Sequence, residues 1–176
     1  LYAGSSFGRR ANPLSDYILE AVLIANNRPG TPVKLVWTRE EDTQGGYYRP
    51  MYYHEIRAGL DKQGNPIAWE QRIVGQSILK NTPFEEFMVK DGIDATSVEG
   101  ASTLPYAIPN MQVDVHDVVL PVPVLWFRSV GHTHTAFSTE VFIDELCRAA
   151  KQDPVAYRMK LLQGHPRHQG VLKLAA

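Results

Sequence analysis

Two glycine-containing loops carry the residues of this sequence that are most suited to chemistry. The first loop is Gly4-Ser5-Ser6-Phe7-Gly8-Arg9-Arg10. Its small residues let backbone N–H groups approach a ligand oxygen, and its two guanidinium groups could grip a phosphate. It lacks the Gly-Lys-Ser/Thr ending of a Walker loop and the preceding strand of a dinucleotide fingerprint. From the residues alone, it is either a linker with solvated arginines or an anion-binding loop.

The second loop is Trp126-Phe127-Arg128-Ser129-Val130-Gly131-His132-Thr133-His134. Arg128, held between aromatic side chains and a glycine turn, is a candidate fixed donor to an anionic or carbonyl oxygen. His132 and His134 stand two apart, so in an extended segment both rings would face one side as a zinc half-site. A zinc ion needs at least a third ligand, and no other histidines show the usual ligand-pair spacing. Hydrogen-bonded loop histidines are the simpler interpretation.

Other catalytic patterns are weak. The single cysteine, Cys147, excludes an intramolecular disulfide framework and an iron–sulfur cluster or zinc knuckle built from this chain's own thiolates. It falls in the middle of an apolar helix face, where a thiol is expected to be buried and inert. No pair of carboxylates stands out as an acid/base dyad, and there is no Gly-x-Ser-x-Gly elbow.

The composition is that of one ordinary soluble domain. The 176 residues include 18 Lys and Arg against 19 Asp and Glu, a net charge of -1, which gives no electrostatic footprint for nucleic acid. No apolar run approaches the roughly 18 residues of a membrane span. The Arg9-Arg10 pair is not followed by the apolar core of an export signal. We expect residues 1–176 to be a single domain, excised from inside a larger protein, and its compartment is not readable from the sequence.

The elements around the first loop are predicted from capping and periodicity. A helix is expected over residues 17–25, buried on more than one side because apolar residues surround it. Residues 33–37 have the composition of a short strand. Thr38 then begins a capped turn or short helix that breaks at Gly45-Gly46.

The elements before the second loop are predicted to form a sheet. Alternation over residues 52–60, turn residues at 61–65 and renewed alternation at 67–73 indicate an antiparallel hairpin. Residues 77–110 read as a long covering loop with one helical turn near residues 84–87. A further strand is expected over residues 113–120.

The last third is predicted to be helical. Residues 136–150 gather an apolar face, with Glu140 at its edge, where a carboxylate needs a partner. Asp153-Pro154 caps a second helix that ends at Gly164, and residues 164–168 are expected to be an exposed connector. The predicted fold is α+β, with two layers, a mostly antiparallel sheet and about three helices.

Both loops together resemble the xanthine oxidase/aldehyde oxidoreductase family of molybdenum hydroxylases. The first loop is similar to that family's Gly-Gly-Gly-Phe-Gly loop, and the second is similar to the Arg-Ser-Val-Gly-His-Ser-His segment of its isoquinoline 1-oxidoreductase beta subunit group. The resemblance covers essentially the whole chain. It extends to Val36-Trp37-Thr38-Arg39-Glu40-Glu41-Asp42, Leu104-Pro105-Tyr106-Ala107-Ile108-Pro109-Asn110, Glu140-Val141-Phe142-Ile143-Asp144-Glu145-Leu146 and Asp153-Pro154-Val155-Ala156-Tyr157-Arg158.

The resemblance implies roles for individual residues. Phe7 and Gly8 match the residues beside the molybdenum centre, and Arg128 matches the catalytic arginine that points toward the substrate. Ser129, Val130 and Gly131 match the stretch whose backbone amides bind the pterin dinucleotide. No residue of this chain is implied as a direct metal ligand. Ser5 and Ser6 depart from the family pattern, which has glycine at both positions.

The resemblance also implies a function for the parent protein. It would be a bacterial enzyme that uses molybdopterin cytosine dinucleotide and water-derived oxygen to oxidise an N-heteroaromatic ring carbon or an aldehyde. This chain would be one lobe of its cofactor-binding region, inactive alone, with the rest of the polypeptide and a small 2Fe–2S subunit as partners. The alternatives are a non-catalytic binding or assembly module and a zinc-binding module that uses His132 and His134.

Overall fold

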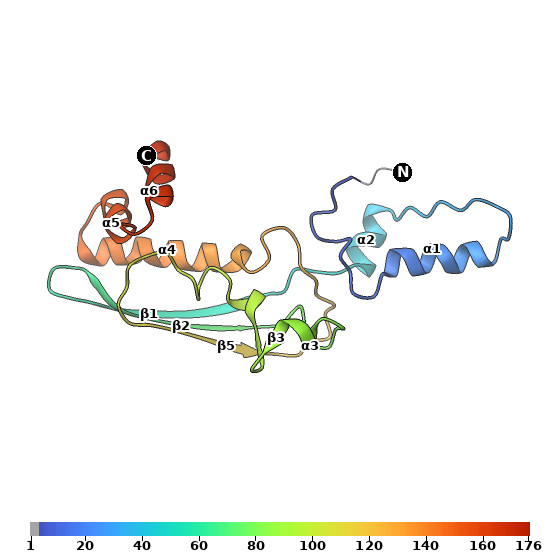
Figure 1. Ribbon diagram of the computed structural model, residues 1–176, viewed down its shortest axis with the longest axis horizontal. Helices are drawn as coiled ribbons and strands as arrows, with labels where there is room; N and C mark the ends of the chain where they lie inside the picture. The colour runs from blue at the N-terminus through green and yellow to red at the C-terminus, as the bar shows by residue number, and fades with distance from the viewer. Residues whose placement is uncertain (1–3) are drawn as a thin grey trace.

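A three-stranded sheet of order β1-β2-β5 forms one layer of this protein (Figure 1). The structure is a computed structural model and describes residues 4–176. β1 (Tyr52–Leu60) pairs antiparallel with β2 (Pro66–Gly75), as predicted, and β5 (Met111–Asp117) pairs parallel with β2. The turn between β1 and β2 is held by Asp61, whose carboxylate accepts from the backbone N–H groups of Gln63 and Asn65. The sheet is therefore mixed, and its third strand begins and ends before the predicted bounds of 113–120.

The long helix α4 (His132–Ala150) lies along one face of the sheet and supplies the second layer (Figure 1). Its buried Ile143 and Leu146 join Trp69 of β2 and Tyr157 of α5 (Pro154–Leu161) in one hydrophobic core. The predicted two-layer α+β arrangement and the apolar face of this helix are confirmed. The helix begins four residues earlier than the predicted start at residue 136, inside the second loop.

Two helices start where their capping residues indicate. The Asp153 carboxylate accepts from the N–H groups of Val155 and Ala156 at the start of α5, with proline at the first helical position. At the start of α2 (Arg39–Gly45), the Thr38 and Glu41 side chains cap each other's backbone N–H groups. Both helix starts confirm the prediction.

Glu140 has the partner that its position at the edge of the apolar stripe requires. The Tyr106 hydroxyl donates to its carboxylate at 2.9 Å, and Arg158 Nε donates at 2.9 Å. Arg158 also pairs with Asp144 at 2.7 Å. These contacts fasten α5 and the chain before β5 to α4.

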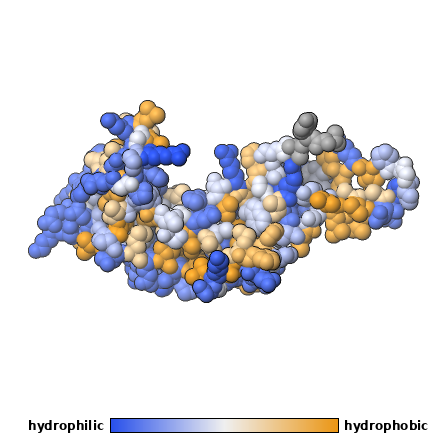
Figure 2. Space-filling view, in the orientation of Figure 1, coloured by the Kyte–Doolittle hydropathy of each residue, from blue (hydrophilic) through white to orange (hydrophobic). Residues whose placement is uncertain are grey.

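The N-terminal arm, residues 4–46, stands beside the sheet and differs most from the prediction. Figure 1 shows α1 (Asp16–Asn26) and α2 at one end of the molecule, and Figure 2 shows apolar side chains gathered there. The expected burial of this helix is wrong, because nothing among residues 4–176 packs over its apolar side chains. Five apolar side chains of α1 are between 43% and 54% exposed: Ile18, Leu19, Val22, Leu23 and Ile24.

The strand predicted for residues 33–37 is also wrong. These residues pair with no other strand in the described part of the chain, so their β-forming composition has no ladder to join. Trp37 instead ties the segment to α1, because its indole N–H donates to Glu20 Oε2 at 2.8 Å.

Residues 77–110 contain more structure than the single helical turn predicted for them. That turn is α3 (Glu85–Met88), and it is followed by a small hairpin of β3 (Val89–Lys90) and β4 (Ile93–Asp94) and by the 3-10 helix η1 (Ala95–Val98). Residues 164–168 are exposed, as predicted, but they form a connector only up to His165, because α6 (Pro166–Ala175) begins at Pro166. The described residues thus hold six α-helices, counting short ones, rather than about three. Among these helices, none combines the length and the apolar character that a membrane span requires.

Candidate functional site

The two candidate loops meet in the structure. The Arg128 N–H donates to the carbonyl oxygen of Phe7 at 2.7 Å. Gly8 has φ +102°, and a Cβ there would lie 3.1 Å from the Cα of Phe127. A glycine is required here because both its backbone angle and the close approach exclude a side chain. The structure therefore brings Phe7, Gly8 and Arg128 together, although Phe7 and Arg128 lie 121 positions apart in the sequence.

The turn over residues 128–131 has an unusual backbone. Ser129 has φ 75° and Val130 has φ 39°, and a positive φ in a β-branched residue is a genuine outlier. Such strain costs on the order of 1–3 kcal/mol per residue and persists only where the surroundings enforce it. Here Gly131 enforces it, because its N–H donates to Glu99 Oε2 at 3.1 Å and a Cβ on it would lie 2.0 Å from the Thr96 carbonyl oxygen.

Backbone N–H groups at the junction of the loops differ in what they bind. The N–H of Val130 donates to the Phe127 carbonyl at 2.9 Å, and that of Gly131 is bound to Glu99. Among residues 4–176, the N–H groups of Gly8 and Ser129 have no partner. Of the three amides implied to bind a cofactor, only that of Ser129 is thus free to donate to a ligand.

The Arg128 side chain is exposed and makes no hydrogen bond or ion pair with the described residues. Its backbone is held by a second arginine: Arg49 Nη1 donates to the Arg128 carbonyl oxygen at 3.1 Å and to Thr133 Oγ1 at 2.8 Å. The Arg49 guanidinium also lies 5.4 Å from the centre of the Phe127 ring. Sequence reasoning missed Arg49, since nothing in its local sequence indicates that it reaches the second loop.

The two arginines of the first loop are engaged within the arm. Arg9 pairs with Asp16 through its two terminal nitrogens, Nη1 at 3.2 Å and Nη2 at 2.7 Å. Arg10 Nη2 donates to the Gly4 carbonyl oxygen at 2.6 Å. Burial opposes ionisation of Asp16, but the hydrogen bonds from Arg9 and from the Tyr17 N–H outweigh it and lower its pKa. Arg9 is therefore committed to Asp16 rather than free to grip a phosphate.

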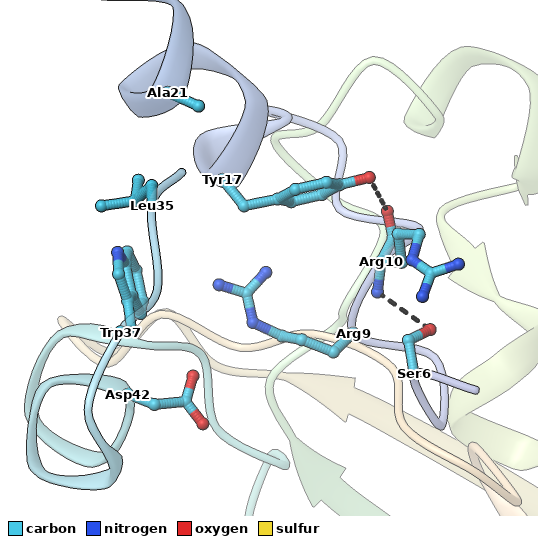
Figure 3. A pocket seen from close by; sticks show the side chains of 8 residues that line it. All are labelled: Ser6, Arg9, Arg10, Tyr17, Ala21, Leu35, Trp37 and Asp42. Carbon is cyan, nitrogen blue, oxygen red and sulfur yellow. Dashed lines mark hydrogen bonds between the residues drawn. The ribbon is translucent and has the colours of Figure 1, made fainter. Parts of the chain in front are cut away.

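A cavity of about 330 Å³ lies on the arginine side of the first loop. Figure 3 shows the Arg9 guanidinium among Tyr17, Trp37 and Asp42, with Leu35 and Ala21 beyond them. The first loop thus presents two sides, with Phe7 and Gly8 against the second loop and its arginines toward this cavity.

The two histidines of the second loop are not arranged as a metal half-site. His132 and His134 both belong to α4, where positions two apart diverge by about 200° instead of facing one side. The extended conformation that the zinc alternative needs is therefore wrong. Within residues 4–176, no three His, Cys, Asp or Glu side chains come close enough together to hold a metal ion.

His134 points to the sheet, and Cys147 is buried. His134 Nδ1 lies 2.9 Å from His54 Nε2 on β1.

Cys147 is 2% exposed, and burial raises the pKa of its thiol, so it is poorly suited to act as a nucleophile.

Comparison with known proteins gives a consistent match. The family described as "Molybdopterin cofactor-binding domain" matches residues 1–162. The chain is 27% identical over 179 residues to the membrane-bound aldehyde dehydrogenase [pyrroloquinoline-quinone] of Gluconacetobacter polyoxogenes, covering 95% of this chain and 22% of that protein. It is 26% identical over 178 residues to isoquinoline 1-oxidoreductase subunit beta of Brevundimonas diminuta, covering 98% and 22%. The chain thus spans about a fifth of the length of these curated relatives.

A solved structure shares the fold. The aldehyde oxidoreductase from Desulfovibrio gigas superposes with a TM-score of 0.68 at 24% sequence identity, over 89% of this chain and 16% of that one. At this identity, the likeness shows a common fold.

Proposed function

Since this chain belongs to the molybdopterin cofactor-binding domain family, we propose that its two joined loops form one wall of the cofactor site of a molybdenum-dependent oxidoreductase. The observation that carries the proposal is the 2.7 Å hydrogen bond from Arg128 to Phe7, which joins the two loops that the resemblance singles out. The chain is then one lobe of a larger molybdopterin-binding subunit.

The residues at this junction fit a group that presents oxygen atoms. Gly8 and Ser129 offer N–H groups that no described residue uses, and Arg128 offers an exposed guanidinium beside them. Fixed N–H donors suit anionic and carbonyl oxygens because they need little reorganisation on binding. When bound, the molybdenum cofactor supplies the redox centre that accepts the electrons removed from the substrate.

This chain's own residues then bind and orient. The N–H groups of Gly8 and Ser129 would donate to oxygen atoms of the cofactor. Arg128 would donate to an oxygen on which negative charge develops during the reaction, and Arg49 holds the backbone of Arg128 in place. In this arrangement Arg128 is the catalytic residue and Arg49 is a positioning residue.

The finer proposals concern the cofactor form, the substrate and the partners. We propose molybdopterin cytosine dinucleotide as the cofactor, an N-heteroaromatic ring carbon or an aldehyde as the substrate, and a small 2Fe–2S subunit as the partner through which the electrons pass. The names of the isoquinoline and aldehyde relatives support this choice of substrate classes. The non-catalytic binding or assembly module remains the alternative, and the absence of cofactor or turnover would favour it.

The test uses the complete protein that contains this chain, produced in a host that makes the cofactor. Molybdenum, zinc, iron, released pterin and released cytidine monophosphate are measured per mole of protein. Pyrroloquinoline quinone, for which one relative is named, is measured in the same extracts. About one molybdenum and one pterin per mole support the proposal, and a protein without either contradicts it.

The Arg128→Ala variant tests the catalytic role. We expect turnover of aldehydes or N-heteroaromatics to fall by roughly 100- to 1000-fold with the molybdenum content retained, since a donor to developing charge is lost. Arg148→Ala is the matched control, because Arg148 is exposed on α4 and lies far along the helix from the loop junction. Unchanged turnover in Arg128→Ala would remove Arg128 from the mechanism while leaving the cofactor site intact.

A further inference from the structure

Four side chains form a hydrogen-bonded chain between the sheet and the second loop. Trp69 Nε1 donates to Gln71 Oε1 at 3.2 Å, and Gln71 Nε2 lies 3.1 Å from His54 Nδ1. His54 Nε2 in turn lies 2.9 Å from His134 Nδ1. The chain starts in the core, where Trp69 is 2% exposed and Gln71 is fully buried, and it ends in the first turn of α4.

The direction of every bond in this chain follows from its first member. An indole N–H can only donate, so the Gln71 oxygen must face Trp69 and the Gln71 amide nitrogen must face His54. That nitrogen donates, so His54 Nδ1 accepts and His54 carries its proton on Nε2. His54 Nε2–H therefore donates to His134 Nδ1, and a neutral His134 must carry its proton on Nε2.

The last N–H of the chain is buried and has no acceptor among the described residues. His134 lines a hollow of about 10 Å³ together with Arg49, Trp126, Val130 and Gly131, among other residues. A hollow of this size is about the smallest that holds one water molecule. It lies against the same turn whose strained backbone presents Arg128 and Ser129.

We propose that His134 is a positioning residue, held as the Nε2–H tautomer by the Trp69–Gln71–His54 chain, and that it binds one ordered water against the buried side of the 128–131 turn. The tautomer and the water are independent of the proposed function. Only the positioning role rests on that function.

The surroundings of His134 favour the neutral ring. Tyr52 stacks on it with ring centres 3.7 Å apart and planes 16° apart. The titratable rings in contact with it are Tyr52 and His54 on β1, and Arg49, before β1, lines the same hollow, whereas Glu99 contacts His132 and Gly131 instead. Burial, followed by His54, lowers the pKa of His134 to about 4, and burial raises that of Tyr52 to about 12.

Nitrogen NMR of the complete protein with ¹⁵N-labelled histidine tests the tautomer. We expect the His54 and His134 signals, assigned by their loss in His54→Gln and His134→Phe, to show unprotonated Nδ1 and protonated Nε2 at pH 7. The His134 signals should change little down to pH 5, because burial lowers the pKa of His134 to about 4. Protonated Nδ1 in His134, or titration of His134 near pH 6.5, would overturn the proposal.

Two variants of His54 separate the hydrogen bond from simple packing. Gln in His54→Gln keeps an N–H donor for His134 Nδ1, so the His134 tautomer should be retained. His54→Leu removes that donor, so His134 should become a mixture of tautomers with a higher pKa. The same His134 spectrum in both variants would show that the chain does not set the tautomer.

A high-resolution crystal structure of the complete protein tests the water. We expect one water within hydrogen-bond distance of His134 Nε2 in the wild type and none in His134→Phe, which keeps an aromatic ring on Tyr52. A hollow that is dry in the wild type contradicts the water site.

The molybdenum content tests the positioning role. In a protein whose wild type is loaded with molybdenum, His134→Phe should lower the molybdenum content, and an unchanged content contradicts that role.

Discussion

Gly8 faces Trp126 so closely that a Cβ at position 8 would lie 2.9 Å from the Trp126 carbonyl oxygen. This contact and the bond from Arg128 to Phe7 make the first and second loops one structural unit. A change in either loop is therefore expected to displace the other.

Gly8→Ala should separate the loops. Alanine at φ +102° is strained, and its methyl group meets backbone atoms that cannot rotate away. We expect the molybdenum content of the complete protein to fall at least about tenfold, which corresponds to a loss of about 1.4 kcal/mol in binding. Gly4→Ala is the matched control, because a Cβ at Gly4 meets nothing within 4 Å. Equal metal contents in the two variants would show that the contact with Trp126 does not matter.

Arg49→Ala should loosen the turn that presents Arg128. The variant loses two hydrogen bonds from a charged donor, each worth about 1.5–3 kcal/mol when well formed. Because Arg49 is exposed, we expect turnover to fall about tenfold with little change in thermal stability. Arg57→Ala is the control, since Arg57 is an exposed arginine on β1 whose only ion pair within residues 4–176 is with Glu55. Steady-state kinetics measure the turnover of both variants, and thermal unfolding measures their stability.

Acidic pH should weaken the contact between α4 and the sheet. The pKa values of His54 and His134 are lowered, that of His134 to about 4, so below pH 6.5 the unfolded chain binds protons that the folded chain does not. Their contribution to stability is complete above about pH 6.5 and is lost progressively as the pH falls toward 4. Hydrogen exchange of the α4 amides, corrected for the intrinsic rate, should therefore speed up between pH 7 and pH 4.5.

Phenylalanine in His134→Phe cannot take up a proton, so the acid-induced increase in α4 exchange should be smaller in that variant. His116→Gln should keep the wild-type response, because His116 is exposed on β5. A wild-type response in His134→Phe would assign the acid sensitivity to other groups.

Ile143→Ala should destabilise the core of the two layers. Ile143 is fully buried in α4, and removing a buried isoleucine to alanine costs about 2–5 kcal/mol. Val141→Ala, which lies two residues away and is 40% exposed, should change stability by less than about 1 kcal/mol. Urea unfolding followed by α4 and β1 signals measures both, and similar values for the two would place the core elsewhere.

Local patterns predicted the parts of the fold that depend on near neighbours in sequence. The alternation of β1 and β2, the apolar face of α4 and the Asp153 cap all appear as expected. The strand at residues 33–37 and the burial of α1 were wrong because each depends on a partner element that residues 4–176 do not provide. The helix at 166–175 differs from the predicted connector because Pro166 occupies the first helical position, where a proline is compatible with a helix.

The sequence indicates which residues belong to the candidate site, but it does not indicate how they are arranged in space. Phe7, Gly8 and Arg128 are identified by their motifs, but the bond that joins them is a tertiary contact. The pairing of His134 with His54 follows from α4 beginning at His132, since an extended segment would have turned both loop histidines to one side. Arg49 reaches Arg128 only because β1 runs beside the start of α4.

The joint between Phe7 and Arg128 also sets an order of events during synthesis. The first loop is synthesised before its partner, which follows only after the sheet and the covering loop have been made. Contacts between such distant positions carry a large loop-closure entropy, so they form once the intervening elements are in place. The wall that we propose for the cofactor site is therefore incomplete in a nascent chain, and on that proposal the cofactor is inserted after this part of the protein has folded.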